Sequence, residues 1–333
     1  MSYLHQTAPI ASSARVMRSV SLACLPGIAA QTWYFGAGVI TNVLTGILCC
    51  CLVEALMLAA RSRPLRPTLA DGSAMLTGIL LGAALPAGTS VWLILIGAVA
   101  AIAVAKHLYG GLGHNIFNPA MVGYAMLLVS FPVPLSLWPD ATGFGAGDVQ
   151  NLSHLWQGWL GQLDANTLDA VSGATPLDAL RQPAGASVIG DANLSSPWAI
   201  ISLAWLAGGL VLLAQRLIDW RLPLAMLSTM AVLAALLNQV SGTGSVAFHL
   251  FNGATIMGAF FIITDPVSAP GHRRARWVFG AAIGVLVMLI RGYGGYPDAI
   301  AFAVLLMNLS APLLDQLCSG THRSASDAPR GNS

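Results

Sequence analysis

Charged residues are scarce in this 333-residue sequence. Asp, Glu, Lys and Arg make up 8% of the chain, against about a quarter in soluble globular domains. Hydrophobic residues make up 56%. This composition excludes an ordinary soluble domain and predicts that most of the surface faces lipid. The net charge of +2 comes from basic residues spread over short loops, so no nucleic-acid partner is expected.

Cysteine is missing from the segment where disulfides could form. None of the five cysteines lies in residues 139–196, the long polar stretch inside the chain, so no disulfide framework is expected. Cys49, Cys50 and Cys51 are consecutive and would point in three directions on a helix, which favours apolar packing over a shared metal.

Long apolar runs, by contrast, fill the chain, and several reach the roughly 20 residues that cross a bilayer. Ten are recognisable, near residues 19–35, 39–60, 72–86, 90–105, 118–138, 197–214, 221–238, 249–263, 275–290 and 297–313. They predict an all-α integral membrane protein with about ten transmembrane helices. The runs at 72–86 and 249–263 are short and Gly-rich, which favours broken or tilted helices packed centrally. We expect the first run to be a retained helix rather than a signal peptide.

The placement of the basic residues predicts the orientation. If the N-terminus is cytoplasmic, all of the 15 Lys and Arg residues except Arg181 and Arg291 fall in cytoplasmic loops, as the positive-inside rule expects. Both termini should then be cytoplasmic, with residues 139–196 in the periplasm of a cell with an inner membrane.

Two pairs of similar segments indicate an internal repeat. Residues 71–78 resemble 252–259, and residues 119–128 resemble 297–306, at offsets of 181 and 178 residues. Because each half would hold an odd number of helices, the halves would be inverted in the membrane. The expected division is a first five-helix repeat in 1–138, a periplasmic loop in 139–196, a second five-helix repeat in 197–318 and a disordered cytoplasmic tail in 319–333.

One short string carries chemistry. Asp169-Ala-Val-Ser-Gly-Ala-Thr175 matches D-x-x-[ST]-G-A-T, the pattern at which flavin transferases esterify a threonine hydroxyl with the phosphate of FMN. Chance would produce it in about one chain in a thousand of this length. Gly173 and Ala174 leave the approach to Thr175 open, and Asp169 and Ser172 fix the local turn. The string predicts covalent FMN on Thr175, with the other motif residues recognised by the transferase.

A similar string, Asn252-Gly-Ala-Thr255, offers an internal comparison. His249 stands where the motif has aspartate and Asn252 where it has serine, and the string begins an apolar run. We therefore expect Thr255 to be a packing residue.

Glu54, the only glutamate of the chain, falls within the second apolar run. Ionisable groups at membrane depth are costly to bury, which makes Glu54 a candidate for an ion path. Asp71, Lys106, Asp265 and Asp298 lie near helix ends and could belong to the same proton or cation path. The alternative is that Asp71, Asp265 and Asp298 cap helices and that Lys106 extends to the cytoplasmic surface.

Longer runs resemble one family over nearly the whole chain except the tail. They are VEALM at 53–57, KHLYGGLGHNIFNPAMVGY at 106–124, TDPVS at 264–268 and GGYPDAIAFAVLL at 294–306. With the flavinylation string they resemble the NqrB/RnfD family of membrane flavoprotein subunits. Within this family the sequence resembles the RnfD-type subunits of the Rnf electron transport complex more than the NqrB subunits of the sodium-pumping quinone reductase. NqrB carries a longer N-terminal extension that this sequence lacks.

The resemblance implies a urea-transporter-like fold of two inverted five-helix repeats. It implies an FMN-carrying subunit of a complex that couples electron flow between ferredoxin and NAD to movement of sodium ions or protons; in some bacteria such a complex instead keeps a redox regulator reduced. The implied partners are RnfA, RnfB, RnfC, RnfE and RnfG, a flavin transferase and membrane lipid. A second, noncovalent riboflavin or FMN is implied by analogy with NqrB. No catalytic acid, base or metal is needed from this chain.

Two other classes stay open. The repeat and the short Gly-rich helices would also suit a channel or permease for a small solute, although a permease has no use for a flavin tether. A structural anchor for soluble redox partners would differ from an electron carrier only if Thr175 were unmodified.

Overall fold

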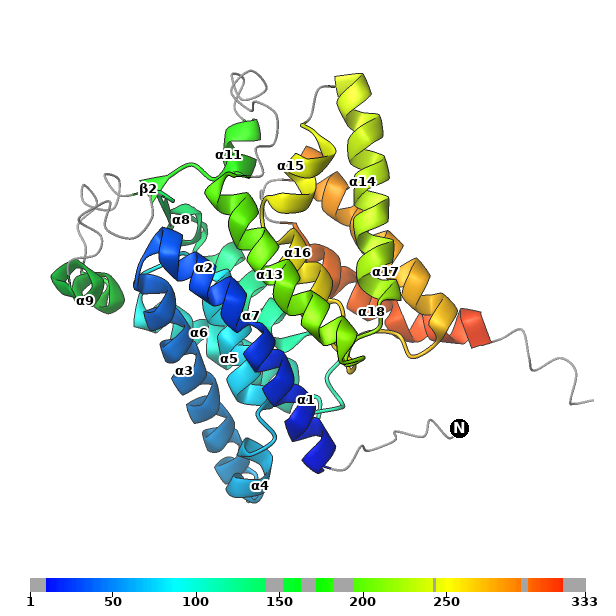
Figure 1. The fold of residues 1–333 in the computed structure, drawn as a ribbon. Helices are drawn as coiled ribbons and strands as arrows, with labels where there is room; N and C mark the ends of the chain where they lie inside the picture. The colour runs from blue at the N-terminus through cyan, green and yellow to red at the C-terminus, as the bar shows by residue number, and fades with distance from the viewer. Residues whose placement is uncertain are drawn as a thin grey trace, which may run out of the picture.

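The computed structural model describes residues 10–141, 152–162, 172–181, 195–241, 244–294 and 299–319, and these are mostly helical (Figure 1). The first half holds α1 (Ile10–Ala23), α2 (Leu25–Phe35), α3 (Gly38–Ala60), α4 (Leu65–Leu69), α5 (Ser73–Ala84), α6 (Val91–Ala98), the π-helix η1 (Val99–His107), α7 (Pro119–Ser130) and α8 (Pro132–Ser136). The connecting segment holds β1 (Trp138–Pro139), α9 (Leu152–Leu160), β2 (Ser172–Gly173) and α11 (Pro176–Arg181). The second half holds α13 (Pro197–Ala214), α14 (Arg221–Ser241), α15 (Val246–Phe251), α16 (Thr255–Met257), the π-helix η3 (Gly258–Ile262), α17 (Arg273–Tyr293) and α18 (Ile300–Ser319).

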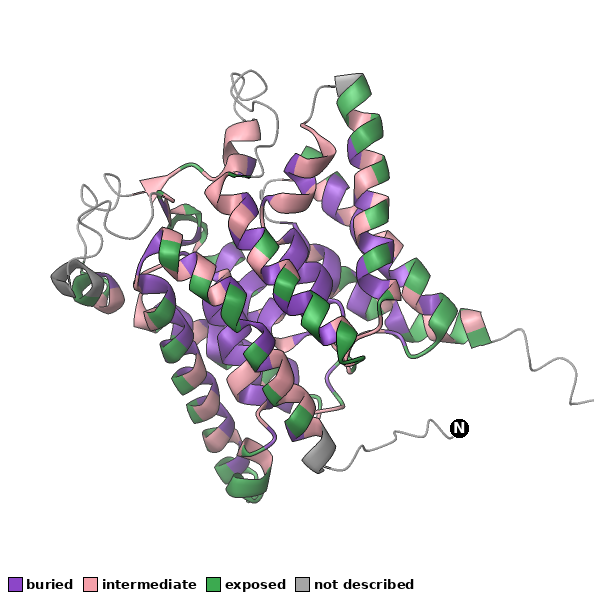
Figure 2. Ribbon diagram, in the orientation of Figure 1, coloured by how far each residue is buried: buried purple, intermediate pink, exposed green. Residues whose placement is uncertain are grey.

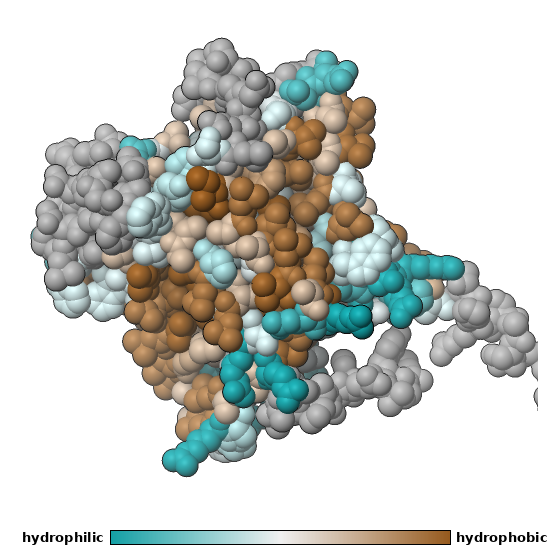
Figure 3. Space-filling view, viewed as in Figure 1, coloured by the Kyte–Doolittle hydropathy of each residue, from teal (hydrophilic) through white to brown (hydrophobic). Residues whose placement is uncertain are grey.

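Five of the described helices are long and apolar enough to cross a membrane: α3, α13, α14, α17 and α18. Helices α5 and α7 and the continuous α6–η1 are apolar but shorter. Leu44, Leu48, Leu52 and Leu56, at every fourth position of α3, are 51% to 68% exposed. Figure 3 shows the resulting hydrophobic belt, with hydrophilic residues gathered below it. An apolar stripe that faces outward is expected where lipid is the solvent, so the prediction of an all-α, multi-pass membrane protein is confirmed.

The two short Gly-rich segments lie at the centre, as predicted. Nine of the twelve residues of α5 are buried, and so is every residue of α16 and η3. Figure 2 shows this buried interior surrounded by helices whose outward faces are exposed. Short helices are tolerated at membrane depth when other protein surrounds them.

Two predicted runs are each divided into two helices. The run at 19–35 spans α1 and α2, which are divided at Cys24 because Pro26, in the first turn of α2, has no N–H to bond to the preceding turn. A Cβ on Gly27 would overlap the indole ring of Trp205, so this glycine allows α2 to pack against α13. In the run at 118–138, α7 ends at Ser130 and the chain continues as α8.

The two ends of the molecule differ in character. One end, which we call the motif end, holds β1, β2 and α11; the other, the basic end, holds α4 and the loops before α14 and α17 (Figure 1). At the basic end Asp219 accepts hydrogen bonds from the guanidinium groups of Arg221 and Arg276, at 3.1 and 2.6 Å. Burial alone raises the pKa of Asp219, but the hydrogen bonds and charges of both arginines outweigh it and hold the pKa below its usual range.

Helices α3 and α5 cross at glycines, which yields a testable expectation. A Cβ on Gly78 would lie 2.5 Å from the backbone of Gly46, whereas one on Gly292 of α17 meets nothing within 4 Å. Gly78→Ala should therefore destabilise the chain by about 1–3 kcal/mol through overpacking, while Gly292→Ala is neutral or slightly stabilising. Thermal unfolding of both variants in detergent measures the difference. Equal midpoints would contradict the close crossing.

Candidate functional site

The flavinylation string is attached to the motif end by a short strand pair. β1 and β2 are antiparallel, with Trp138 opposite Gly173 and Pro139 opposite Ser172. A Cβ on Gly173 would overlap the carboxylate of Asp140. The structure thus gives Gly173 a packing reason in addition to the open approach that the sequence predicted. Asp169 of the motif lies outside the described residues.

Thr175 is separated from β2 by Ala174 and immediately precedes α11, whose first residue is Pro176. Its hydroxyl donates to Oδ2 of Asp178 at 2.6 Å, and the backbone N–H of Asp178 donates back to Oγ1 of Thr175 at 3.2 Å. The second contact is an N-cap, because it satisfies an N–H of the first turn of the helix. Thr175 is half-buried and Ala174 before it is exposed, so this part of the string lies at the surface of the motif end.

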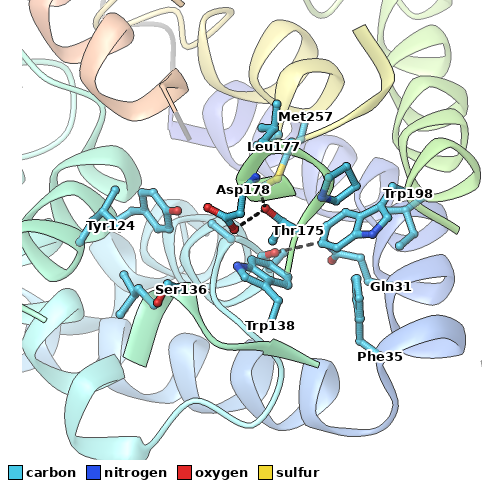
Figure 4. A pocket seen from close by; sticks show the side chains of 18 of the residues that line it. Gln31, Phe35, Tyr124, Ser136, Trp138, Thr175, Leu177, Asp178, Trp198 and Met257 are labelled. Carbon is cyan, nitrogen blue, oxygen red and sulfur yellow. Dashed lines mark hydrogen bonds between the residues drawn. The ribbon is translucent and has the colours of Figure 1, made fainter. Parts of the chain in front are cut away.

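Thr175 and Asp178 line a cavity of about 360 Å³ between the motif end and the central helices. Three aromatic rings stand together in its wall: Phe35 of α2, Trp138 of β1 and Trp198 of α13, with ring centroids 5.1 to 5.7 Å apart. Figure 4 shows these rings around the Thr175 side chain. Tyr124, Trp205 and Met257 also line the cavity. A largely apolar, aromatic cavity of this size suits a planar organic ligand with few polar groups.

Thr255 has a different environment. It is fully buried, and its hydroxyl lies 3.0 and 3.1 Å from the carbonyl oxygens of His249 and Asn252. The guanidinium of Arg291 donates to it at 2.8 Å and to the carbonyl of His249 at the same distance. Thr255 is thus a packing residue, as predicted. Arg291, one of the two basic residues expected outside, is buried and holds the α15–α16 turn together.

A cluster of buried polar side chains lies between the helices, near the basic end. Its centre is an ion pair between Glu54 of α3 and Lys106 of η1, the only glutamate and the only lysine in the chain. Nζ of Lys106 lies 2.6 Å from Oε1 of Glu54 and 2.7 Å from Oγ of Ser73. Lys106 is 2% exposed, so the prediction that it extends to the cytoplasmic surface is wrong. The buried carboxylate of Glu54 offers a stronger electrostatic partner than the surface does.

The aspartates near this cluster fulfil the capping prediction in part. Oδ1 of Asp71, the residue before the N-cap Gly72, accepts from the backbone N–H and the hydroxyl of Ser73, so it satisfies the first N–H of α5 from outside the N-cap position. Asp265 instead accepts from Val267 N–H and the Ser268 hydroxyl within the loop after η3, so it stabilises a turn rather than a helix. Asp298 lies outside the described residues.

Helix α5 runs between the aromatic cavity and the Glu54–Lys106 ion pair. Its first residue, Ser73, contacts Lys106, while Ala83 and Ala84 at its other end line the aromatic cavity. Ten residues of helix separate Ser73 from Ala83, about 15 Å at 1.5 Å per residue. The candidate flavin site and the buried ion pair therefore lie at opposite ends of one central helix.

The profile described as the NQR2, RnfD, RnfE family matches residues 3–322. The chain belongs to this family. A relative from Aeromonas salmonicida is 46% identical over 321 residues, covering 91% of this chain and 92% of its own; one from Ectopseudomonas mendocina is 48% identical over 311 residues, covering 90% and 89%. One from Alcanivorax borkumensis is 45% identical and covers 95% of each chain. All three are named as the same subunit of an ion-translocating oxidoreductase complex.

Membership of the NQR2, RnfD, RnfE family confirms the resemblance found in the sequence, but sequence reasoning missed several residues of the site. Asp178 carried a local signal, because Thr175-Pro-Leu-Asp178 fits the capping pattern [ST]-x-x-[DE]. Phe35, Trp138 and Trp198 carried none, since each sits in a separate part of the chain and only the fold brings their rings together.

Proposed function

We propose that this chain is the FMN-carrying membrane subunit of an Rnf-type, ion-translocating oxidoreductase complex, and that it passes electrons through FMN bound to Thr175 by a phosphoester. The observation that carries the proposal is the position of Thr175, on the rim of an aromatic cavity and at the end of a full D-x-x-S-G-A-T string. The names of the three relatives support the role in such a complex.

The residues of the site fit this cofactor. Thr175 supplies a hydroxyl for the phosphoester, and the cavity beside it is large enough for a ring system, at about 360 Å³. Phe35, Trp138 and Trp198 offer ring faces and edges for stacking and exclude water. When bound, FMN supplies the redox chemistry, while the protein sets its position and surroundings.

The wider arrangement belongs to the same proposal. It comprises about ten transmembrane helices in two inverted five-helix repeats, cytoplasmic termini in the inner membrane, and assembly with RnfA, RnfB, RnfC, RnfE and RnfG. It also includes electron exchange on the ferredoxin/NAD side and sodium ions or protons as the translocated ion. Its last part is a second flavin that is bound noncovalently. The similar strings at 71–78 and 252–259 support the repeat, because both run into short, buried central helices.

The direct test is mass spectrometry and in-gel flavin fluorescence of the denatured chain after coexpression with its flavin transferase. We expect the chain to fluoresce, to gain the mass of one FMN residue, and to carry that mass on the peptide containing Thr175. A chain that stays unmodified beside an active transferase would remove the electron-carrier role and favour the permease class.

The contact between Thr175 and Asp178 predicts how the hydroxyl is prepared. In the transfer, Oγ1 of Thr175 attacks the FMN phosphorus of a flavin dinucleotide, the phosphoanhydride bond breaks and AMP leaves. The proton of the hydroxyl passes to Oδ2 of Asp178, which already accepts its hydrogen bond. Asp178→Asn should therefore slow flavin attachment about a hundredfold, the lower range for a general base.

The rate of FMN incorporation into the purified complex, with transferase and flavin dinucleotide added, measures this effect. Asp140→Asn is the matched control, since it removes an exposed carboxylate next to Gly173 without touching Thr175. If Asp178→Asn loads as fast as Asp140→Asn, then Asp178 serves only to cap α11.

A further inference from the structure

Gln31 of α2 is the amide in the wall of the aromatic cavity, and its orientation is fixed. Its Nε2 donates to the carbonyl oxygen of Ala83, at the end of α5, at 3.2 Å. An oxygen cannot donate to a carbonyl, so the assignment of nitrogen and oxygen follows from this contact. The other end of the amide, Oε1, is therefore an acceptor.

This acceptor has no partner in the described part of the chain. Oε1 of Gln31 is buried and makes no hydrogen bond there, and the residue as a whole is 8% exposed. A buried acceptor without a donor costs about 1–3 kcal/mol. Gln31 lines the same cavity as Thr175, and Figure 4 shows both among the side chains that surround it.

Asn42 of α3 shows what distinguishes Gln31. Its Nδ2 donates to the carbonyl of Pro86 at 2.7 Å, just beyond α5, and its Oδ1 is likewise buried without a partner among the described residues. Asn42 does not line the aromatic cavity. The two amides share their anchoring and their unmet acceptor, but only Gln31 belongs to the wall of the aromatic cavity.

We propose that Oε1 of Gln31 accepts a hydrogen bond from the N3–H group of the flavin ring held in this cavity. The inference rests on the proposed attachment of FMN to Thr175. An acceptor requires a donor, and N3–H is the only N–H of the oxidised isoalloxazine ring, the form that a flavin dinucleotide delivers. The stacking rings recognise any flat aromatic ligand, whereas Gln31 selects one with an N–H at its edge.

The test combines a protein variant with a flavin analogue. The wild-type complex and Gln31→Met are each loaded with flavin and with 3-methylflavin, which lacks the N3 hydrogen, and the ratio of reduced to oxidised flavin is measured at one fixed ambient potential. N3–H is present in both redox states, so the ratio reports only the difference in hydrogen-bond strength between them. Methylation should change the ratio about two- to threefold in the wild type and leave it nearly unchanged in Gln31→Met. General effects of polarity cancel, because both flavins experience them.

Two further variants make the outcome decisive. Asn42→Leu removes an equivalent amide outside the cavity and should keep the wild-type response to methylation. Gln31→Leu also lacks the acceptor and should show the same weakened response as Gln31→Met, which covers the case in which Gln31→Met does not accumulate. Equal responses in the wild type and in Gln31→Met or Gln31→Leu overturn the role of Gln31 while leaving the attached flavin in place. Absence of attached flavin from the wild type overturns both proposals.

Discussion

Thr175→Ala is expected to remove all covalently bound flavin, because the oxygen that forms the phosphoester is lost. Thr175→Ser keeps a hydroxyl at the same place and should retain much of the flavin, although serine caps α11 without the methyl group of threonine. Fluorescence and intact mass of the denatured chain, divided by the amount of folded protein, give the flavin content of each variant.

Thr255→Val provides the matched control. It removes the hydroxyl of the similar string at 252–255 while keeping the shape of the side chain, and flavin content per folded chain should be unchanged. The expectation follows from exposure: Thr255 is fully buried beneath Arg291, whereas Thr175 is half-buried beside the exposed Ala174. Flavin that persists in Thr175→Ala would place the attachment elsewhere and contradict the proposal.

Helical content and central packing were predictable because they follow from local composition. The Gly-rich runs at 72–86 and 249–263 are short and lack charged side chains, apart from aspartates at their ends. Helices this short are stable at membrane depth only when other protein surrounds them, so burial at the centre was expected. The break inside 19–35 was also encoded, by Pro26, but a hydropathy window averages over a single proline. Local signals thus fixed which segments are helical better than where each one ends.

Contacts between distant residues were not predictable. Lys106 was expected at the surface because its side chain is long and near a helix end, and nothing local shows that Glu54, 52 residues earlier, faces it. Gln31 was unremarked for the same reason, since only the fold places it beside Thr175. The motif could be read from sequence alone because a transferase recognises a short string, whereas the cavity beside it is assembled from separate helices.

Breaking the Glu54–Lys106 pair is expected to be the most damaging change to stability. Both side chains are almost fully buried, at 0% and 3% exposure, and Nζ lies 2.6 Å from Oε1. Lys106→Met leaves the buried carboxylate of Glu54 without its ammonium partner and with Nε2 of His107 at 3.6 Å, and Glu54→Gln leaves the ammonium of Lys106 with weaker partners. Removing one member of a buried pair costs about 3–5 kcal/mol.

The double variant Glu54→Gln, Lys106→Met should recover most of the loss, because no uncompensated charge remains, glutamine keeps the length of glutamate and methionine is only one atom shorter than lysine. Thermal unfolding in detergent of the wild type, both single variants and the double variant forms a complete cycle. A double variant no more stable than the worse single variant would show that the pair is not the source of the effect.

The same double variant separates a structural role from an ion path, the function predicted for Glu54 from sequence. Ion uptake driven by electron transfer is measured in vesicles that contain the whole complex. If the pair only holds α3 against η1, the recovered fold restores ion uptake. If Glu54 handles the ion, the chain folds, keeps its flavin and loses uptake, because glutamine cannot bind or exchange a cation as a carboxylate does. Uptake at the wild-type rate in the double variant would remove Glu54 from the ion path.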